Sequence, residues 1–421
     1  MKKTWCSLLL AVLVLLTAAG CGSAFEKEYY YEEPFSGDFG TPAGDVTEIR
    51  NYSMLKTALT GMISRREERG DFRLNNYNGN PSEDLASVCY EIKSSNPLGT
   101  YAVETLSYET NYVVSYYVAT VYITYHRSAE EIAAVHYASG LAELDEWVRS
   151  AVDEREPETV IRIYASTVDE TYLRNLVHSY YLEHSVTQVA EPTVQVDSYP
   201  VEGPNRIYVL KMDYGLPEFV IEPMAWETKA VIADAALILQ EQHPDPAKLA
   251  LDAAVWLSDL CAGGDGETGY PDTPYGALVR HNAGPKGLAL AYRGLCDALG
   301  LECVVAEGTV GAKGGETHFW NIIGLDGAYY HVDISAFAEN PEKAFLLNDE
   351  SLWGTCIWDT ERYPACAGPL RYADVVPPAE EPAETEEPGE TSPEDTLSPA
   401  EEPPAAQPEN ENSEEKSENT P

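Results

Sequence analysis

The sequence of 421 residues predicts an α+β protein with two folded domains between polar tails. Residues 285–299 carry apolar side chains three and four positions apart, as one helix face requires, and short apolar runs typical of strands follow. Residues 70–215 mix alternating stretches rich in Tyr, Val and Thr with helix-capping patterns, which indicates strands and helices together. About 350 residues between the tails suit two domains.

The N-terminus has the pattern of a targeting segment. Lys2 and Lys3 precede the apolar run Leu8–Leu16, which is too short for a membrane-spanning helix and is followed by small residues. The run Ala-Ala-Gly-Cys that ends at Cys21 resembles a bacterial lipobox. We therefore expect residues 1–20 to be a lipoprotein signal peptide, with Cys21 lipidated. An ordinary secretory signal is the alternative, and either places the mature protein outside the cytoplasm. Residues 21–47 form an acidic linker.

Composition separates the folded part from a C-terminal tail. The formal net charge is −43, which argues against nucleic acid as a partner because phosphate binding needs clustered Lys and Arg. Residues 376–421 are rich in Glu, Pro, Ala, Ser and Thr, and contain too little apolar surface to form a core. We predict that this segment is a disordered acidic tail. It serves as a solvated spacer or, alternatively, as an interaction tail.

An N-terminal α/β domain is predicted at residues 48–215. Its expected elements are a helix at 49–69, strands at 101–107, 112–125, 160–164 and 206–212, and two helices opened by capping boxes. The first box is Ser128–Glu131, with a helix running to about Val152. The second is Thr167–Glu170, with a helix to about Leu182. The strand, capping box and helix thus occur twice, as a faint internal repeat. The histidines here are scattered and show no catalytic pattern: His126, His136, His178 and His184.

The second domain, at residues 216–375, contains the candidate site. Helices are expected at 217–242, 245–260 and 285–299, and Gly300 suits a left-handed helix end. A strand at 303–306 and a hairpin of 318–325 with 328–335 follow, because Asp326-Gly327 is a strong two-residue turn signal. If Leu325 pairs with Ala328, His318 lies diagonal to Asp333, within side-chain reach. A carboxylate there orients an imidazole, as in a nucleophile–base–orienter triad.

Several motifs occur in an order that resembles the bacterial transglutaminase-like (papain-like thiol) superfamily. The matching segments are Tyr275–Leu278, Gly287–Ala289, Gly300–Cys303, His318–Asn321 and Asp326–Asp333. The resemblance implies a transglutaminase-like fold with His318 and Asp333 as catalytic residues and Trp320 and Asn321 in the cleft. It also implies a nucleophilic cysteine at position 285, where this chain has Pro285. A helix start lowers a thiol pKa and favours the thiolate. Proline fits the first helical turn but has no nucleophile.

The remaining cysteines offer no obvious substitute. Cys296 lies three turns along the helix, and Cys303 follows it. Cys356 and Cys366 are close enough for a local disulfide, with buried free thiols as the equal alternative. The cysteines are too scattered to indicate a metal site, and no cofactor is expected.

We interpret the protein as an exported lipoprotein, anchored to the membrane by Cys21, whose transglutaminase-like domain has lost catalysis. In this interpretation His318 and Asp333 are vestigial, and the domain binds a peptide or cell-wall ligand or acts as a scaffold at the cell surface. The alternative is an active acyltransferase or cysteine-type peptidase with an unrecognised nucleophile. A passive surface lipoprotein without a ligand is a third hypothesis.

Overall fold

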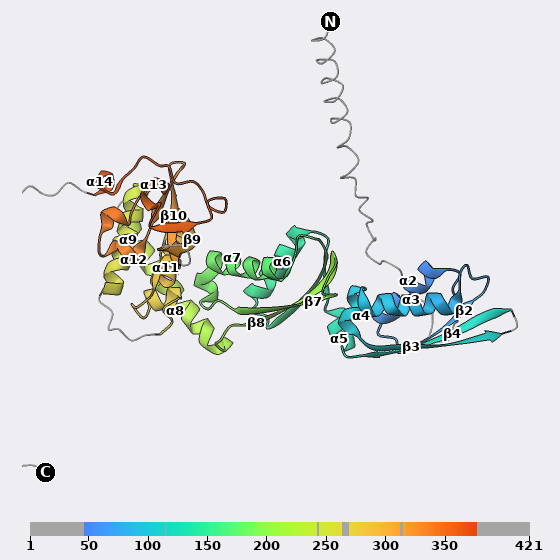
Figure 1. Ribbon diagram of the computed structural model, residues 1–421. Coiled ribbons are helices and arrows are strands. Elements are labelled where there is room, and N and C mark those ends of the chain that lie inside the picture. Colours follow the sequence, from blue (N-terminus) through green and yellow to red (C-terminus); the bar gives the residue numbers. More distant parts are fainter. Residues whose placement is uncertain (1–45, 114, 242–243, 263–268, 312–314, 377–421) are drawn as a thin grey trace, which may run out of the picture. The chain divides into compact units, whose positions relative to one another are not determined.

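The computed structural model describes residues 46–113, 115–241, 244–262, 269–311 and 315–376. The expected signal peptide, Cys21, most of the linker and the tail from residue 377 lie outside these residues. By its backbone contacts the chain separates into Met1–Val375 and Val376–Pro421. The described part is α+β, as the sequence predicts (Figure 1). Within it, no helix has both the length and the apolar character needed to cross a membrane.

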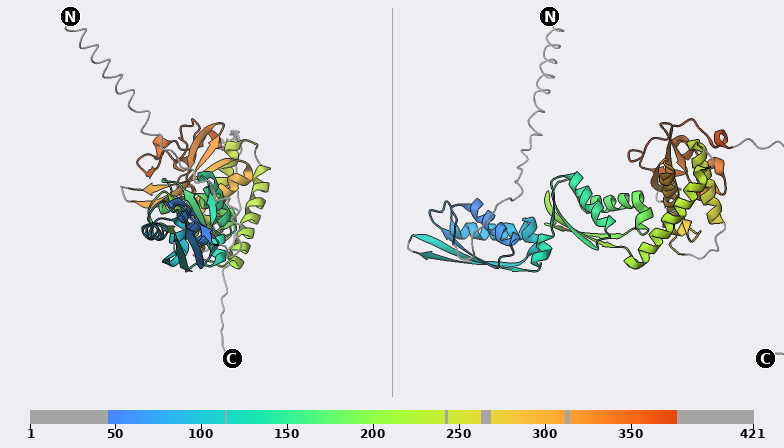
Figure 2. Two further views of the ribbon diagram at one scale, coloured as in Figure 1. Left: turned by 90° about the vertical axis from the view of Figure 1, so that its right-hand side faces the viewer. Right: turned by 180° about the vertical axis from the view of Figure 1, so that it is seen from behind.

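The segment expected to form one α/β domain at 48–215 holds two four-stranded sheets (Figures 1 and 2). The two sheets and their helices form two consecutive segments, which we call the first and second repeats because they share one topology, as shown below. The first repeat contains β1 (Thr47–Glu48), α2 (Tyr52–Ser64), β2 (Arg69–Leu74), α3 (Pro81–Ser94), α4 (Pro97–Ala102), β3 (Val103–Val113) and β4 (Tyr116–Tyr125). After α5 (Ala129–Ala133), the second repeat contains β5 (His136–Ala138), α6 (Leu141–Asp153), β6 (Glu158–Tyr164), α7 (Glu170–Gln188), β7 (Thr193–Tyr199) and β8 (Asn205–Asp213).

The two repeats share one topology. The strand orders are β1-β2-β4-β3 and β5-β6-β8-β7. In each sheet the first pair is parallel and the other two pairs are antiparallel. Arg69 and Glu158 begin the second strands, and Tyr116 and Asn205 begin the last ones, so both pairs of positions are 89 residues apart. The chain therefore contains a tandem βαβαββ repeat.

An unusual helix end occurs at the same place in both repeats. Arg66 and Arg155 follow α2 and α6 with φ of 54° and 53°, a left-handed conformation that non-glycine residues rarely adopt. In each case the next residue donates its backbone N–H to a carbonyl five positions back, from Glu67 to Met62 at 2.9 Å and from Glu156 to Ala151 at 2.9 Å. The shared conformation supports the equivalence of the two repeats.

Two sequence-based expectations for this region were wrong. The helix predicted from Ser128 to about Val152 is broken into α5, the edge strand β5 and α6. Ser128 does form its capping box, but Gly140 starts a new helix and β5 pairs with β6. The faint repeat was also misplaced. Both predicted capping boxes lie after residue 126, whereas the structural repeats start with β1 and β5, and the second box does not form because Asp169, not Thr167, is the N-cap of α7.

The C-terminal region forms one antiparallel sheet with helices. Its order is β11-β10-β9-β12. Its elements are α8 (Glu218–Gln240), α9 (Pro246–Ala262), α10 (Pro274–Leu278), α11 (Pro285–Leu299), β9 (Glu302–Val310), β10 (Glu316–Leu325), β11 (Ala328–Val332), α12 (Ile334–Phe337), a 3-10 turn at Pro341–Lys343, α13 (Asp349–Leu352), β12 (Cys356–Trp358) and α14 (Tyr372–Val375).

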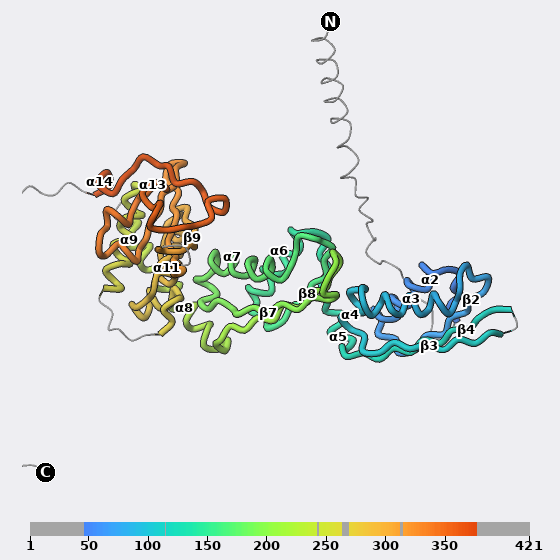
Figure 3. Tube along the Cα trace, viewed as in Figure 1, coloured from blue at the N-terminus to red at the C-terminus, as the bar shows by residue number. Residues whose placement is uncertain are grey.

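Helix α7 contributes to two hydrophobic cores. Leu173 and Val177 pack in the core of the second repeat. Tyr181 and Leu182 instead pack with Ala289 of α11 and with the β9–β10 sheet. The trace in Figure 3 follows the chain from α7 through α8 to α11. The second repeat therefore supplies part of the packing around the start of α11.

Candidate functional site

The β10–β11 hairpin brings His318 and Asp333 together. Leu325 pairs with Ala328, which confirms the predicted register. Asp326 and Gly327 both have positive φ, 50° and 79°, as a tight two-residue hairpin turn requires. His318 Nε2 lies 2.8 Å from Asp333 Oδ2. Because Asp333 holds Nε2, Nδ1 is the nitrogen that a nucleophile would have to approach.

Asp333 also has a structural role. Its Oδ1 accepts hydrogen bonds from the Ser335 backbone N–H at 3.0 Å and the Ser335 hydroxyl at 2.6 Å, and so caps the short helix α12. Burial alone would raise the pKa of Asp333, but the hydrogen bonds from His318 and Ser335 hold it below its ordinary value. The carboxylate is therefore ionised at neutral pH and can both orient His318 and cap α12.

Trp320 and Asn321, the expected cleft residues, are buried and point to opposite faces of the sheet. Trp320 is 1% exposed, and its ring stacks on His318 with centroids 6.0 Å apart. Asn321 is fully buried, and its Nδ2 donates to Ala289 O of α11 at 2.9 Å. Asn321 thus ties β10 to α11, while Trp320 packs beside the base.

The Trp320 side chain begins a series of hydrogen bonds that the sequence did not predict. Its Nε1 donates to His331 Nδ1 at 2.9 Å, and His331 Nε2 lies 2.9 Å from Asp349 Oδ1. Asp349 Oδ2 accepts from the Cys366 backbone N–H at 3.2 Å. An indole nitrogen can only donate, so His331 Nδ1 carries no proton and Nε2 does. Burial lowers the pKa of His331, consistent with this neutral ring.

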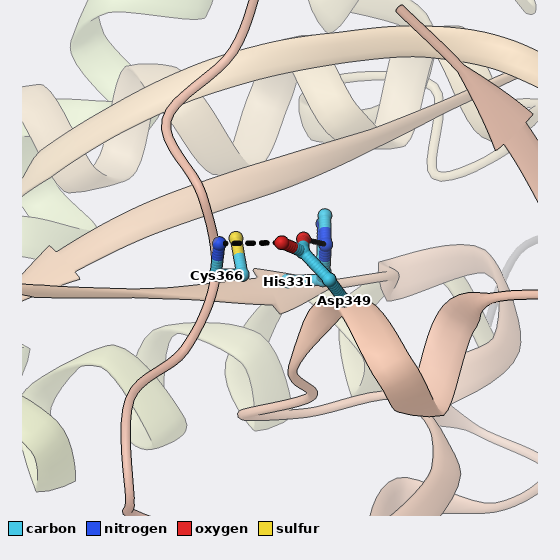
Figure 4. Close-up of side chains that lie close together, drawn as sticks. All are labelled: His331, Asp349 and Cys366. Carbon is cyan, nitrogen blue, oxygen red and sulfur yellow. Dashed lines mark hydrogen bonds and ion pairs between the residues drawn. The ribbon is translucent and has the colours of Figure 1, made fainter. Parts of the chain in front are cut away.

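His331, Asp349 and Cys366 have side chains that could in principle ligate a metal (Figure 4). Their ligand atoms lie within 4.8 Å of one another. A metal bound to a neutral imidazole needs a free lone pair on one nitrogen and the proton on the other. Here Trp320 occupies Nδ1, and the proton on Nε2 is donated to Asp349. The donor set therefore does not fit a metal ion, and the cluster is a hydrogen-bond network.

The other half of the expected site is the start of α11. The helix spans Pro285–Leu299 and ends at Gly300 with φ 74°, as predicted. Pro285 occupies the first turn, and Gly284, the N-cap, provides no side-chain cap. The next residue, Lys286, forms an ion pair with Glu191. Its Nζ also lies 5.3 Å and 5.2 Å from the ring centroids of Tyr181 and Phe319.

Glu191 and Lys286 belong to a charge network that joins the second repeat to the sheet. His178 on α7 lies between Glu191, at 2.5 Å, and Glu307 on β9, at 3.1 Å. Arg362 is 3.9 Å from Glu307. Hydrogen bonds to Glu191 and then to Glu307 raise the pKa of His178 to about 9, so the ring is charged at neutral pH. His178 and Glu307 lie too far apart in the sequence for any local pattern to predict their contact.

The described cysteines are free thiols, so the alternative of a Cys356–Cys366 bridge is not realised. Burial raises the pKa of Cys261 and Cys356 to about 11 and that of Cys89 and Cys366 to about 12. Burial also raises the pKa of Cys296. Cys303 is 4% exposed, and its sulfur accepts from Asn321 Nδ2 at 3.5 Å. Buried thiols with raised pKa values are poor nucleophiles.

No family model and no curated protein matches this sequence. Two solved structures show a partial likeness. The first is a provisionally assigned cysteine protease from Cytophaga hutchinsonii, with 10% identity and a TM-score of 0.23, covering 34% of this chain and 62% of that one. The second is a TGase, with 12% identity and a TM-score of 0.24, covering 49% and 59%. These values are too low to place the chain in the family of either protein.

Proposed function

We propose that the C-terminal region is a non-catalytic transglutaminase-like domain that binds a peptide or a cell-wall fragment at the cell surface. The observation that carries this proposal is the start of α11, where Pro285 occupies the first turn, at the position that the motif resemblance assigns to the nucleophile. Acyl transfer and thiol-type peptide hydrolysis both need an activated nucleophile beside the base. Proline has no group that can serve.

The surroundings of Pro285 support the same conclusion. In an active thiol enzyme, the helix start and nearby cations stabilise a thiolate. Here Lys286 and His178 instead hold the carboxylate of Glu191, and His178 also holds Glu307. The positive charges near the helix start are thus already satisfied by acidic groups of the same chain.

The membrane anchor is a separate part of the proposal. Cys21 follows an apolar segment and small residues, so we propose that it is lipidated after cleavage of residues 1–20. Stable anchoring generally needs more than one acyl chain. Intact-mass measurement of the mature protein tests this, because an unmodified Cys21 at the N-terminus would contradict it.

An active enzyme is the second candidate, because His318 and Asp333 retain the geometry of a base and its orienter. Time-resolved iodoacetamide labelling of the native protein, mapped by mass spectrometry, separates the two candidates. We expect uniformly slow labelling of the cysteines in the folded region and no amidase or transferase activity. One fast-labelling cysteine whose modification abolishes such an activity would establish the enzyme instead.

The binding role has its own test. Purified peptidoglycan fragments serve as the probe, with binding followed by changes in backbone NMR signals or by calorimetry. Saturable binding with shifts confined to the C-terminal region supports the proposal. Absence of binding at millimolar concentrations would favour a passive scaffold.

A further inference from the structure

Helix α8 has an apolar side that no described element covers. Its buried side includes Ile221, Met224 and Ile232, which face the protein interior. On the outside, Phe219 is 76% exposed, Trp226 71% and Leu237 64%. Exposed side chains of this size on one helix are costly in water and generally indicate an interaction surface.

The outer residues follow a coiled-coil spacing. Phe219, Pro223, Trp226, Ala230, Ala233 and Leu237 are separated by alternating steps of four and three. Such a seam aligns with another helix. The aromatic residues Phe219 and Trp226 lie in the first half of the seam, the small residues Ala230 and Ala233 follow, and Leu237 ends it. We refer to these six residues as the α8 seam.

This distribution of sizes indicates that the partner helix is a second copy of α8. In an antiparallel pair related by a twofold axis, Trp226 meets its symmetry mate at the axis. Phe219 then lies opposite Ala233 of the other copy, so that a large side chain faces a small one. A parallel pair would place Phe219 against Phe219 and Ala233 against Ala233, which leaves crowding at one end and gaps at the other.

The charges fit the same arrangement. Lys229 is the one basic residue of α8 and lies beside the seam on the same flank as Glu222. Antiparallel pairing brings Glu222 of each copy opposite Lys229 of the other, so two reciprocal ion pairs form. Neither side chain forms an ion pair in the part of the chain described here. On the other flank, Glu227 lies beside Glu227 of the other copy near the axis, and this repulsion is opposed by the two ion pairs and the apolar contacts.

We propose that the α8 seam from Phe219 to Ala233 is the contact surface of a homodimer in which two copies of α8 pack antiparallel, with Trp226 at the twofold axis. This surface is separate from the candidate site. The proposed dimer therefore does not depend on the loss of catalysis that we propose for the C-terminal region.

Sedimentation equilibrium of the full chain in a density-matched mild detergent tests the dimer. We expect a concentration-dependent mass that approaches two chains. Trp226→Glu should give a single chain, because it places two carboxylates at the axis. Leu237→Glu is the matched control. Leu237 is similarly exposed, but in this register it extends past the start of the partner's α8, so the dimer should persist.

Charge reversal then tests the antiparallel register. Glu222→Lys and Lys229→Glu should each weaken the dimer by about tenfold in Kd, and the double variant should restore it. A single chain at every concentration, or a double variant no tighter than the single ones, would overturn the proposal. So would a single chain whose binding to phosphatidylglycerol vesicles is lost in Trp226→Glu, because the α8 seam would then face lipid. Thermal midpoints confirm that the variants are folded.

Discussion

The two halves of the expected thiol-enzyme site differ sharply in what they retain. The base half, on the β10–β11 hairpin, keeps the hydrogen bond between His318 and Asp333 at 2.8 Å. The nucleophile half, at the start of α11, has Pro285 and an ion pair between Lys286 and Glu191. Further hydrogen bonds connect the base half to the rest of the fold. In the nucleophile half, the charged residues His178 of α7 and Glu191, which follows α7, lie near the start of α11.

The two halves also differ in how strongly the fold depends on their residues. Asp333 caps α12, and Trp320 connects through His331 to Asp349. Removing these residues would leave buried polar groups unsatisfied. A cysteine at position 285 has no comparable structural duty, because proline is equally suited to a first helical turn. The hydrogen bond between His318 and Asp333 is therefore weak support for catalysis in this chain.

The largest expected effect comes from breaking the base half. Asp333→Ala should lower the free energy of unfolding by about 3 kcal/mol, because it removes the α12 cap and leaves His318 and the Ser335 N–H unpaired. Urea titration followed by tryptophan fluorescence measures the change.

Asp359→Ala is the matched control for Asp333. Asp359 also accepts a backbone N–H two residues on, from Glu361 at 3.0 Å, but it is exposed and has no histidine partner. We expect a cost below about 0.5 kcal/mol there. Equal losses in the two variants would mean that Asp333 is not structural, and its retention would then need a functional explanation.

Introducing a thiol at the start of α11 should change reactivity. In Pro285→Cys, the start of α11 together with the expected base His318 should lower the thiol pKa. We expect iodoacetamide labelling at pH 7 about tenfold faster than in Pro246→Cys, where proline also begins a helix. Peptide mapping over time gives both rates. Similar rates would show that the start of α11 no longer favours a thiolate.

The charge network of the nucleophile half should make stability depend on pH. The pKa of His178 rises from an ordinary value of 6.5 to about 9 in the folded protein. Its contribution is therefore complete below pH 6.5 and is lost as the pH rises through about 9, a change of up to about 3 kcal/mol. His178→Gln should remove this part of the decline in thermal midpoint between pH 7 and 10.

The exposed His126 provides a control, since His126→Gln should leave the decline unchanged. A wild-type midpoint that stays constant from pH 7 to 10 would contradict the charged state of His178. Lowering the pH should remove a different contribution to stability, that of Glu307, whose pKa is lowered chiefly by its hydrogen bond with His178. Its contribution is lost as the pH falls below about 4.

The smallest effect is expected from removing the tail, which should leave both halves of the site unchanged. Truncation after Val376 deletes a segment with few apolar residues, so the thermal midpoint should move by less than about 2 °C. Differential scanning fluorimetry is sufficient for this measurement. A larger fall would show that the tail docks on the folded part.

Local signals predicted the elements of the candidate site well. Asp326-Gly327 gave the hairpin register, and with it the contact of His318 with Asp333. Pro285 and Gly300 gave both ends of α11. In each case one or two residues determine the backbone conformation without help from distant parts of the chain.

Contacts between distant segments were not predictable in this way. His178 meets Glu307 across 129 residues, and nothing near His178 in the sequence distinguishes it from the other histidines. The helix predicted through Gly140 failed because pairing of β5 with β6, a tertiary interaction, outweighs local helix propensity. The tandem repeat was misplaced because its equivalent positions share conformation more than residue type.

The constant period of the tandem repeat has an evolutionary consequence. Arg66 and Arg155 end equivalent helices 89 residues apart, which indicates descent from one duplicated segment. Unequal recombination between equivalent points of the two copies deletes or inserts one complete βαβαββ segment, because every element resumes in register. Homologous chains should therefore differ in length before the C-terminal region by whole multiples of this segment.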